Sequence, residues 1–425
     1  MKARLAAALV LAVVLLPSAQ AAPTDRVAKY AVRDLGTLGG TVTAGADVNA
    51  LSQVVGFSMT ADGFLHAFIW DRGAMTDLGT LGGESSYATA INDAGTVVGF
   101  SQVPHSRSSH AFIWRKGSGM KDLGTLGGDQ SFAADINNAG LVVGRAFDAH
   151  GSPHGFVWSS DTGMHALGGG EPFSVATATA PGTQGAVAGS AGLPLVPGRW
   201  RTPGQPFSPF SLPAGFNQGQ GTAIDARNDV VGSASAPTGL VRAFFRSSAG
   251  AMRVLRVPGI QNSEAASVSN SLRVVGSAYD DPFFLTSAWL ARTPSSPAHL
   301  LLELVPPQAA WTFAYATSVN DRGMIVGTGL HRGRTRAYLL TPDTKEQAAS
   351  LRQFAPGGKR FHKRVAEGLA DALAYLDGGK KAKACAAVKV LQPAVARERT
   401  LSKPVRATFV ADLRGFRRTL GCTAE

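Results

Sequence analysis

A tripeptide that recurs seven times at nearly constant spacing constrains this chain more than any other feature. Val-Val-Gly or a close variant ends at seven glycines, and successive glycines are 43, 45, 45, 43, 44 and 51 residues apart. The seven are Gly56, Gly99, Gly144, Gly189, Gly232, Gly276 and Gly327. A fixed period of this length is typical of repeat architectures, in which each copy is one supersecondary unit.

Each copy has the pattern of four short strands joined by tight turns. In the second copy Ala88–Asn92 is the first strand, and an Asn-Asp-Ala-Gly turn leads into 96–101. The third strand is the apolar run 110–114 and the fourth is 120–123. Four antiparallel strands every ~44 residues are typical of a propeller blade. We therefore predict an all-β fold, a seven-bladed β-propeller of four-stranded antiparallel blades.

The two ends of the repeat region complement each other. The seventh copy has three strands within 311–340, after which the pattern becomes helical. Its missing fourth strand is present near the start of the chain, at Tyr30–Leu35. Because a closed ring leaves no unpaired sheet edge, we expect this strand to complete the last blade of a propeller over 28–342. An open β-solenoid would leave the segment without a role.

A glycine-rich heptad, Asp-Leu-Gly-Thr-Leu-Gly-Gly, begins at the end of Tyr30–Leu35 and recurs twice. A phosphate-binding loop would open a helix and would usually carry a lysine. Here the heptad ends a strand, and Thr, Glu or Asp follows it. Glycines that accept positive φ explain the same residues, so we interpret the heptad as a hinge between blades. The copies are Asp34–Gly40, Asp77–Gly83 and Asp122–Gly128.

The heptad, Ala-x-x-Ile-Asn, Val-Val-Gly and His-Ala-Phe-x-Trp together resemble the HAF family of extracellular repeats. The match is close over Asp34–Trp158 and weaker over 166–342. The resemblance implies an exported bacterial repeat protein. The family carries no established reaction or ligand to transfer.

The N-terminus has the composition of a secretory signal peptide. Lys2 and Arg4 precede an apolar run that ends in Ala19-Gln20-Ala21. We expect residues 1–21 to be removed after Ala21, which makes the mature protein secreted or periplasmic. No later stretch approaches the ~20 apolar residues of a transmembrane helix.

From residue 344 the chain becomes rich in Ala, Lys and Arg with helical spacing. We predict a basic α-helical module over 344–425, with three helices of which the second ends before Pro393. The module holds 17 Lys and Arg against 7 Asp and Glu, whereas 23–343 has 22 of each sign. Attraction to polyanions would therefore reside in the module, and an ordinary solvated face is the alternative. The candidate contacts are Lys359, Arg360, Lys363, Arg364, Lys380, Lys381 and Lys383.

Cys385 and Cys422 are the two cysteines of the chain. Because the chain carries an export signal, we predict that they form a disulfide. Closing a loop of this length would stabilise the module by about 3–4 kcal/mol in the chain-entropy model.

Histidines and tryptophans recur at fixed positions of the copies. Equivalent positions in different blades lie well apart, so we do not expect the histidines to converge on one metal ion. We expect each to bond a turn of its own blade. The tryptophans are expected in the blade cores, with stacking on sugars as the alternative. These residues are His66, His110, His154, Trp70, Trp114, Trp158 and Trp200.

Catalytic groups would be expected where the chain departs from the repeat. These places are Glu171, Glu264, Asp280-Asp281 and the connection 303–316 with Trp311. Paired carboxylates could act as general acid and base, although adjacent Asp residues in a loop are usually solvated. The sequence has no metalloprotease, serine-hydrolase, zinc or calcium motif. We assign no catalytic residue, metal ligand or cofactor.

Two functions from different classes fit these observations. The first is a non-catalytic extracellular or periplasmic binding or surface-scaffold propeller. Its partner would be a cell-surface polysaccharide or another extracellular protein, without specific nucleic-acid recognition. The alternative is a secreted carbohydrate-active hydrolase or lyase that acts from blades four to seven.

Overall fold

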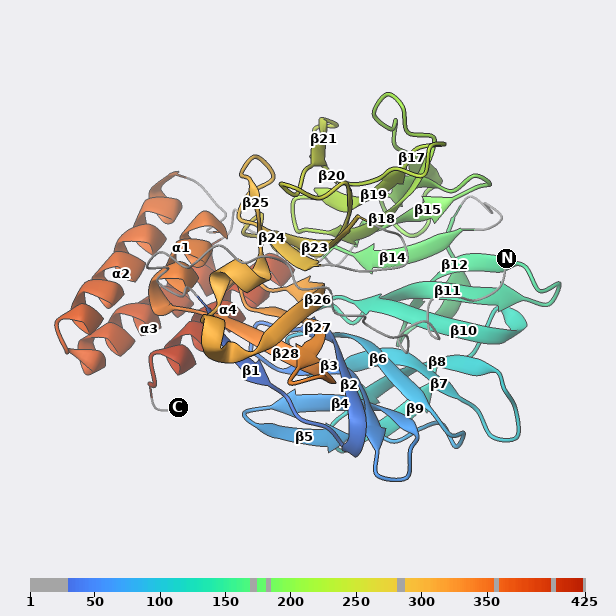
Figure 1. Cartoon of the computed structure of the whole chain (residues 1–425), viewed down its shortest axis with the longest axis horizontal. Coiled ribbons are helices and arrows are strands. Elements are labelled where there is room, and N and C mark those ends of the chain that lie inside the picture. The colour runs from blue at the N-terminus through green and yellow to red at the C-terminus, as the bar shows by residue number, and fades with distance from the viewer. Residues whose placement is uncertain are drawn as a thin grey trace.

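The structure, a computed structural model, is a closed ring of sheets with helices packed on one side (Figure 1). Seven four-stranded antiparallel sheets form the ring, which confirms the predicted seven-bladed propeller. Among the described residues, no helix has the length and apolar content to cross a membrane. The predicted signal peptide lies outside the described residues. Those are 30–168, 174–180, 185–280, 287–354, 359–398 and 403–422.

Six blades are each built from four consecutive strands. The first blade contains β2 (Gly39–Val48), β3 (Val54–Thr60), β4 (Leu65–Asp71) and β5 (Ala74–Asp77). The second contains β6 (Ser86–Ile91), β7 (Val97–Gln102), β8 (Ser109–Arg115) and β9 (Gly119–Asp122). The third contains β10 (Gly127–Ile136), β11 (Val142–Asp148), β12 (Pro153–Ser159) and β13 (Gly163–Ala166). The fourth blade contains β14 (Val175–Thr179), β15 (Val187–Ala191), β16 (Val196–Trp200) and β17 (Phe207–Pro209). The fifth contains β18 (Gln218–Ile224), β19 (Val230–Ser235), β20 (Val241–Arg246) and β21 (Met252–Leu255). The sixth contains β22 (Asn262–Val268), β23 (Val274–Tyr279), β24 (Ser287–Ala291) and β25 (Ala298–Leu300).

The seventh blade joins the two ends of the propeller. Its strands are β26 (Trp311–Val319), β27 (Ile325–His331), β28 (Arg334–Pro342) and β1 (Tyr30–Asp34). β1 pairs antiparallel with β28, as the sequence predicts. Two short 3-10 helices, η1 (Leu301–Leu304) and η2 (Pro307–Ala309), precede the blade.

The repeated Val-Val-Gly is explained by packing on both faces and by a close backbone approach. Val97 and Val98 are both fully buried, and they lie in the cores on opposite sides of their blade. The following glycine, Gly99, lies opposite a shift of register in β6, the first and innermost strand of the blade, which we call the inner strand. A Cβ at Gly99 would lie 1.9 Å from the carbonyl oxygen of Tyr87, and the corresponding distance is 1.9–2.1 Å at all seven glycines. No side chain fits there.

The repeated Asn after the inner strand joins neighbouring blades. Oδ1 of Asn92 accepts hydrogen bonds from the backbone N–H groups of Ala94 (3.1 Å) and Thr96 (3.0 Å) and thereby closes its own turn. Nδ2 of Asn92 donates to the carbonyl oxygen of Asn137 in the next blade (3.2 Å). Because every such group is buried, these bonds stabilise the packing of one blade on the next.

The heptad connects the fourth strand of one blade to the inner strand of the next. In the second copy Gly79 and Gly82 adopt positive φ (+74° and +104°), and Leu78 is buried. Oδ1 of Asp77 accepts a hydrogen bond from the N–H of Gly79 (2.8 Å). The interpretation as a hinge is confirmed, since no helix follows the heptad.

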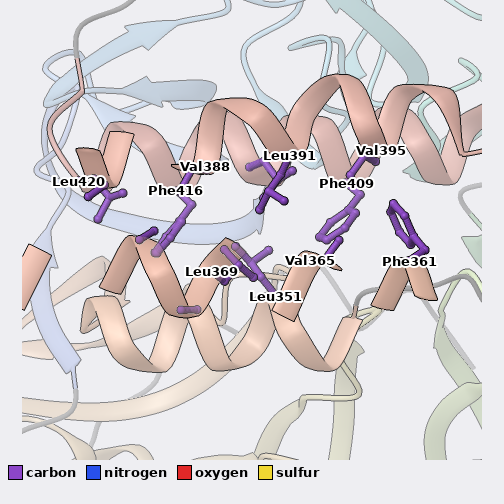
Figure 2. Packing of buried hydrophobic residues seen from close by; sticks show 14 residues of the cluster. Leu351, Phe361, Val365, Leu369, Val388, Leu391, Val395, Phe409, Phe416 and Leu420 are labelled. Carbon is purple, nitrogen blue, oxygen red and sulfur yellow. The ribbon is translucent and has the colours of Figure 1, made fainter. Parts of the chain in front are cut away.

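Four helices follow the propeller and share one apolar core (Figure 2). They are α1 (Thr344–Phe354), α2 (Lys359–Asp377), α3 (Lys381–Arg397) and α4 (Lys403–Thr419). The predicted disulfide is present, with an S–S distance of 1.99 Å between Cys385 and Cys422.

The prediction for the helices was wrong at two points. α1 was not predicted, because it turns buried polar residues such as Gln347 and Ser350 toward the propeller and has only a short apolar stripe. α3 continues through Pro393 to Arg397. Leu391 and Val395 flank Pro393 and are both buried in the helical core, so packing extends the helix past the proline.

Candidate functional site

The helices close one mouth of the central channel. Nδ2 of Asn138, in the turn after β10, donates to Oγ1 of Thr408 in α4 (2.7 Å). The guanidinium of Arg322, in the turn after β26, donates to Oγ1 of Thr419 in α4 (3.2 Å). A cavity of about 290 Å³ lies between these turns, the inner strands and α4.

Carboxyl groups from several blades line this cavity. Oδ2 of Asp135 accepts a hydrogen bond from the N–H of Thr179 in the next blade (2.8 Å). Burial raises the pKa of Asp135 to about 7, and it raises the pKa of Asp225 to about 7 despite the nearby Arg227. Asp135 therefore links two blades, whereas Asp225 bonds within its own turn, and both acids are protonated more readily than an exposed aspartate.

The opposite mouth of the channel lies on the side of the heptads. In blades one to three, the inner strands β2, β6 and β10 run from a heptad toward the turn that faces the helices. Tyr87 stands five residues before Asn92, a distance of about 16 Å along a strand. Residues at the start of the inner strands therefore lie near the mouth that the helices do not cover.

A row of aromatic rings crosses blades one to three at the heptad side. The ring of Tyr87 packs edge-on against Phe57 (centroids 5.1 Å apart) and stacks on Phe100 (4.9 Å). Phe100 packs edge-on against Phe132 (5.1 Å). All four rings are half-buried, so part of each ring reaches the surface.

Arg145 extends the aromatic row at its third-blade end. Its guanidinium carbon lies 5.2 Å from the ring centre of Phe132 and 5.5 Å from that of Phe147. Burial lowers the pKa of Arg145, which nevertheless remains charged at any physiological pH. The row thus combines apolar ring surface with one fixed positive charge.

On blades six and seven, Glu264 and Tyr315 stand at the positions equivalent to Tyr87, and Tyr279 lies beside Glu264. Glu264 is exposed, yet the surrounding protein raises its pKa by desolvation. The hydroxyl of Tyr279 lies 3.5 Å from Oε1 of Glu264, and burial together with Glu264 raises the pKa of Tyr279 to about 12. Burial and the charge of Glu264 also raise the pKa of Tyr315.

The repeated histidines bond within their own blades, as predicted. Nδ1 of His66 lies 2.8 Å from Oδ2 of Asp77, the first residue of the heptad. The same pairing joins His110 to Asp122 (2.7 Å). His154 pairs instead with Asp148 (3.0 Å), because Ala166 replaces the heptad aspartate in its blade. Within the described ranges, no group of three or more His, Cys, Asp or Glu could hold a metal ion.

The tryptophans and the irregular segments are mostly structural. Trp70 and Trp200 are buried in blade cores, and Trp114 and Trp158 pack partly buried against such cores. Trp311 is buried and stacks on His331. Oδ1 of Asp280 accepts a hydrogen bond from the N–H of Gln261 (3.0 Å). Glu171 and Asp281 lie outside the described residues.

Five of the predicted polyanion contacts are exposed on the helical module. Nζ of Lys363 lies 3.7 Å from the carboxylate of Glu367, and Nζ of Lys383 lies 5.9 Å from the ring centre of Tyr375. The side chains of Lys359 and Arg360 lie outside the described part of α2. Polyanion binding stays a prediction. The exposed residues are Lys363, Arg364, Lys380, Lys381 and Lys383.

Sequence reasoning missed the aromatic row and the acid that α4 places over the channel. One signal for the row was available, because Phe57 and Phe100 directly follow Val-Val-Gly in the first two copies. The acid is Asp412, which lies in a helix with no repeat to align it.

Comparisons with known proteins identify no family for this chain, and its similarity to solved structures is low. No family model and no curated protein matches this chain. Among solved structures, a catalytically inactive virginiamycin B lyase from Staphylococcus aureus is 12% identical, with 74% of this chain and 100% of that chain covered and a TM-score of 0.48. YCF48 bound to a D1 peptide is 10% identical (77% and 100% covered, TM-score 0.45). A gluconolactonase from Xanthomonas campestris is 12% identical (74% and 90% covered, TM-score 0.38).

Proposed function

We propose that this chain is an exported, non-catalytic binding protein whose aromatic row recognises a cell-surface polysaccharide. The observation that carries the proposal is the continuous row of Phe57, Tyr87, Phe100 and Phe132 at the uncovered side of the ring. Aromatic side chains at a partly wet surface offer apolar contact area at a low cost in side-chain entropy. The signal-like N-terminus and the resemblance to HAF repeats support the location.

The shape of the row favours an extended ligand over a small one. Four rings from three blades follow one another at centroid distances near 5 Å, so the contact surface is elongated. Arg145 at its end adds a donor for hydroxyl or carboxylate groups of the ligand. A chain of sugar rings presents alternating apolar faces and hydroxyl groups, and it matches both features.

The surroundings of Glu264 favour binding over glycoside hydrolysis. Canonical glycosidases use two carboxyl groups about 5–9.5 Å apart. Among the residues that the structure describes, the one side chain that shifts the pKa of Glu264 is its hydrogen-bonding neighbour Tyr279, which is a phenol and not a carboxylate. The carbohydrate-active alternative would therefore depend on one acid and its phenols.

Affinity electrophoresis in gels that contain single polysaccharides tests the proposal. Replacing Tyr87→Ala or Phe132→Ala should weaken retardation of the mature protein in the gel that retards it, by about 5- to 30-fold in affinity for a loss of about 1–2 kcal/mol. Phe64→Ala is the matched control, because Phe64 is an exposed ring outside the row.

The same variants also give the contradicting outcome. If both row variants are retarded as strongly as the wild type and Phe64→Ala, the row does not carry binding. Unfolding midpoints of all variants should be recorded, so that a loss of retardation is credited to the row only in a folded protein.

A further inference from the structure

We propose that Asp412 and Asp321 form a proton-dependent latch that holds α4 over the channel. Asp412 belongs to α4 and is fully buried at the wall of the 290 Å³ cavity. Neither of its carboxylate oxygens has a hydrogen-bond partner among the described residues. A buried carboxylate without donors is unstable as an anion, so the site demands an explanation.

The groups that face Asp412 come from two blade turns. Asp321, in the turn after β26, lines the same cavity as Asp412, and a proton on either acid would allow a carboxyl–carboxyl hydrogen bond between them. Asp93, in the turn after β6, adds a second negative charge, and Arg322 supplies the facing positive charge. The positive charge of Arg418, which also belongs to α4, lowers the pKa of Arg322. Asp412 and Asp93 thus share one facing arginine.

Donors satisfy the other two acids but not Asp412. Oδ2 of Asp321 accepts from Nδ2 of Asn270 (2.8 Å). Asp93 accepts from the N–H of Ala50 (2.9 Å) and from Nδ2 of Asn138 (2.6 Å). A proton shared between Asp321 and Asp412 would give Asp412 its missing partner and would remove the repulsion between α4 and the ring.

The direction of the pH effect follows from the pKa shifts. Burial, Asp321 and Asp93 raise the pKa of Asp412 well above its ordinary value, and burial raises the pKa of Asp321. Burial also raises the pKa of Asp93 to about 6. When the folded-state pKa of an acid is raised, the acid stabilises the fold fully at pH values below its unfolded-state pKa near 4. This contribution is lost as the pH rises through the folded-state pKa. The latch therefore closes in acid and loosens in neutral to alkaline solution.

Amide hydrogen exchange of the full mature protein tests the latch. Between pH 5 and pH 8.5, after correction for intrinsic rates, α4 should lose protection by at least about tenfold, the factor that one unit of pKa shift supplies. Asp412→Asn cannot ionise, so its α4 should show no such loss, and Asp321→Asn should reduce it. Asp135→Asn is the control, because Asp135 lines the same cavity but bonds to Thr179 of the ring. In this variant α4 should lose protection between the two pH values as it does in the wild type.

Three results would overturn the latch. The first is equal protection of wild-type α4 at the two pH values. The second is an unchanged pH response in both Asp412→Asn and Asp321→Asn. The third is restoration of wild-type protection at pH 8.5 by 1 mM Ca²⁺ but not by the same ionic strength of NaCl, which would show that the acids hold a cation instead of a proton.

Discussion

Deleting residues 22–36 from the mature protein is expected to unfold or aggregate the propeller. The deletion removes β1, which pairs with β28 over five residues, and it removes the buried side chains of Tyr30 and Leu35. It also removes Asp34, whose Oδ2 lies 2.7 Å from Nδ1 of His331. The strand β28 would become an exposed edge at the outer rim of the seventh blade, and exposed edges promote aggregation.

A shorter deletion provides the control for closure. Removing residues 22–27 leaves β1 intact and should leave solubility and the thermal unfolding midpoint unchanged. Both proteins can be compared by sedimentation and by thermal unfolding. A soluble 22–36 deletion with the unfolding midpoint of the control would show that β1 is not needed to close the ring.

Gly99→Ala is expected to destabilise the protein by at least about 3 kcal/mol, near the upper end of single substitutions. The new Cβ would lie 1.9 Å from the carbonyl oxygen of Tyr87, which is fixed in the inner strand of the same blade. Because the neighbour is backbone and not the end of a flexible side chain, the sheet itself must move. The free energy of unfolding, measured in guanidinium chloride, reports this loss.

Gly204→Ala is the matched control for this substitution. A Cβ at Gly204 would have nothing within 4 Å, and this glycine does not have a positive φ. We expect a change within about 0.5 kcal/mol, as for other surface substitutions. Equal stability of the two variants would contradict the explanation of Val-Val-Gly as a close approach.

The propeller could be predicted because each blade repeats the same local physics. Val97 and Val98 pack in the cores on opposite sides of their blade, and Gly99 lets the inner strand approach its own strand closely. Asn92 closes its turn and donates a hydrogen bond to the next blade. Because seven blades need the same residue types at the same positions, these residues recur at a nearly constant spacing in the sequence. The hinge and the histidine pairs were predictable for the same reason.

The aromatic row and the docking of the helices could not be predicted in the same way. Tyr87 and Phe100 face each other on paired strands of one blade, but Phe57 and Phe132 become their neighbours only when blades pack side by side. The pairing of Asp412 with the ring depends on how four helices dock, and nothing in the spacing of the repeat determines that docking. Pro393 misled the helix prediction because local propensity was outweighed by burial of Leu391 and Val395.

The chain length of a bound polysaccharide shows directly whether this propeller binds without catalysis. The mature protein is incubated overnight with the polysaccharide that retards it in a gel, and the length distribution is then measured by size-exclusion chromatography. We expect the distribution to match that of a protein-free sample, while Tyr87→Ala shows weakened binding. Shortened chains with the wild type, and unshortened chains with Glu264→Gln, would show instead that this propeller is a carbohydrate-active enzyme.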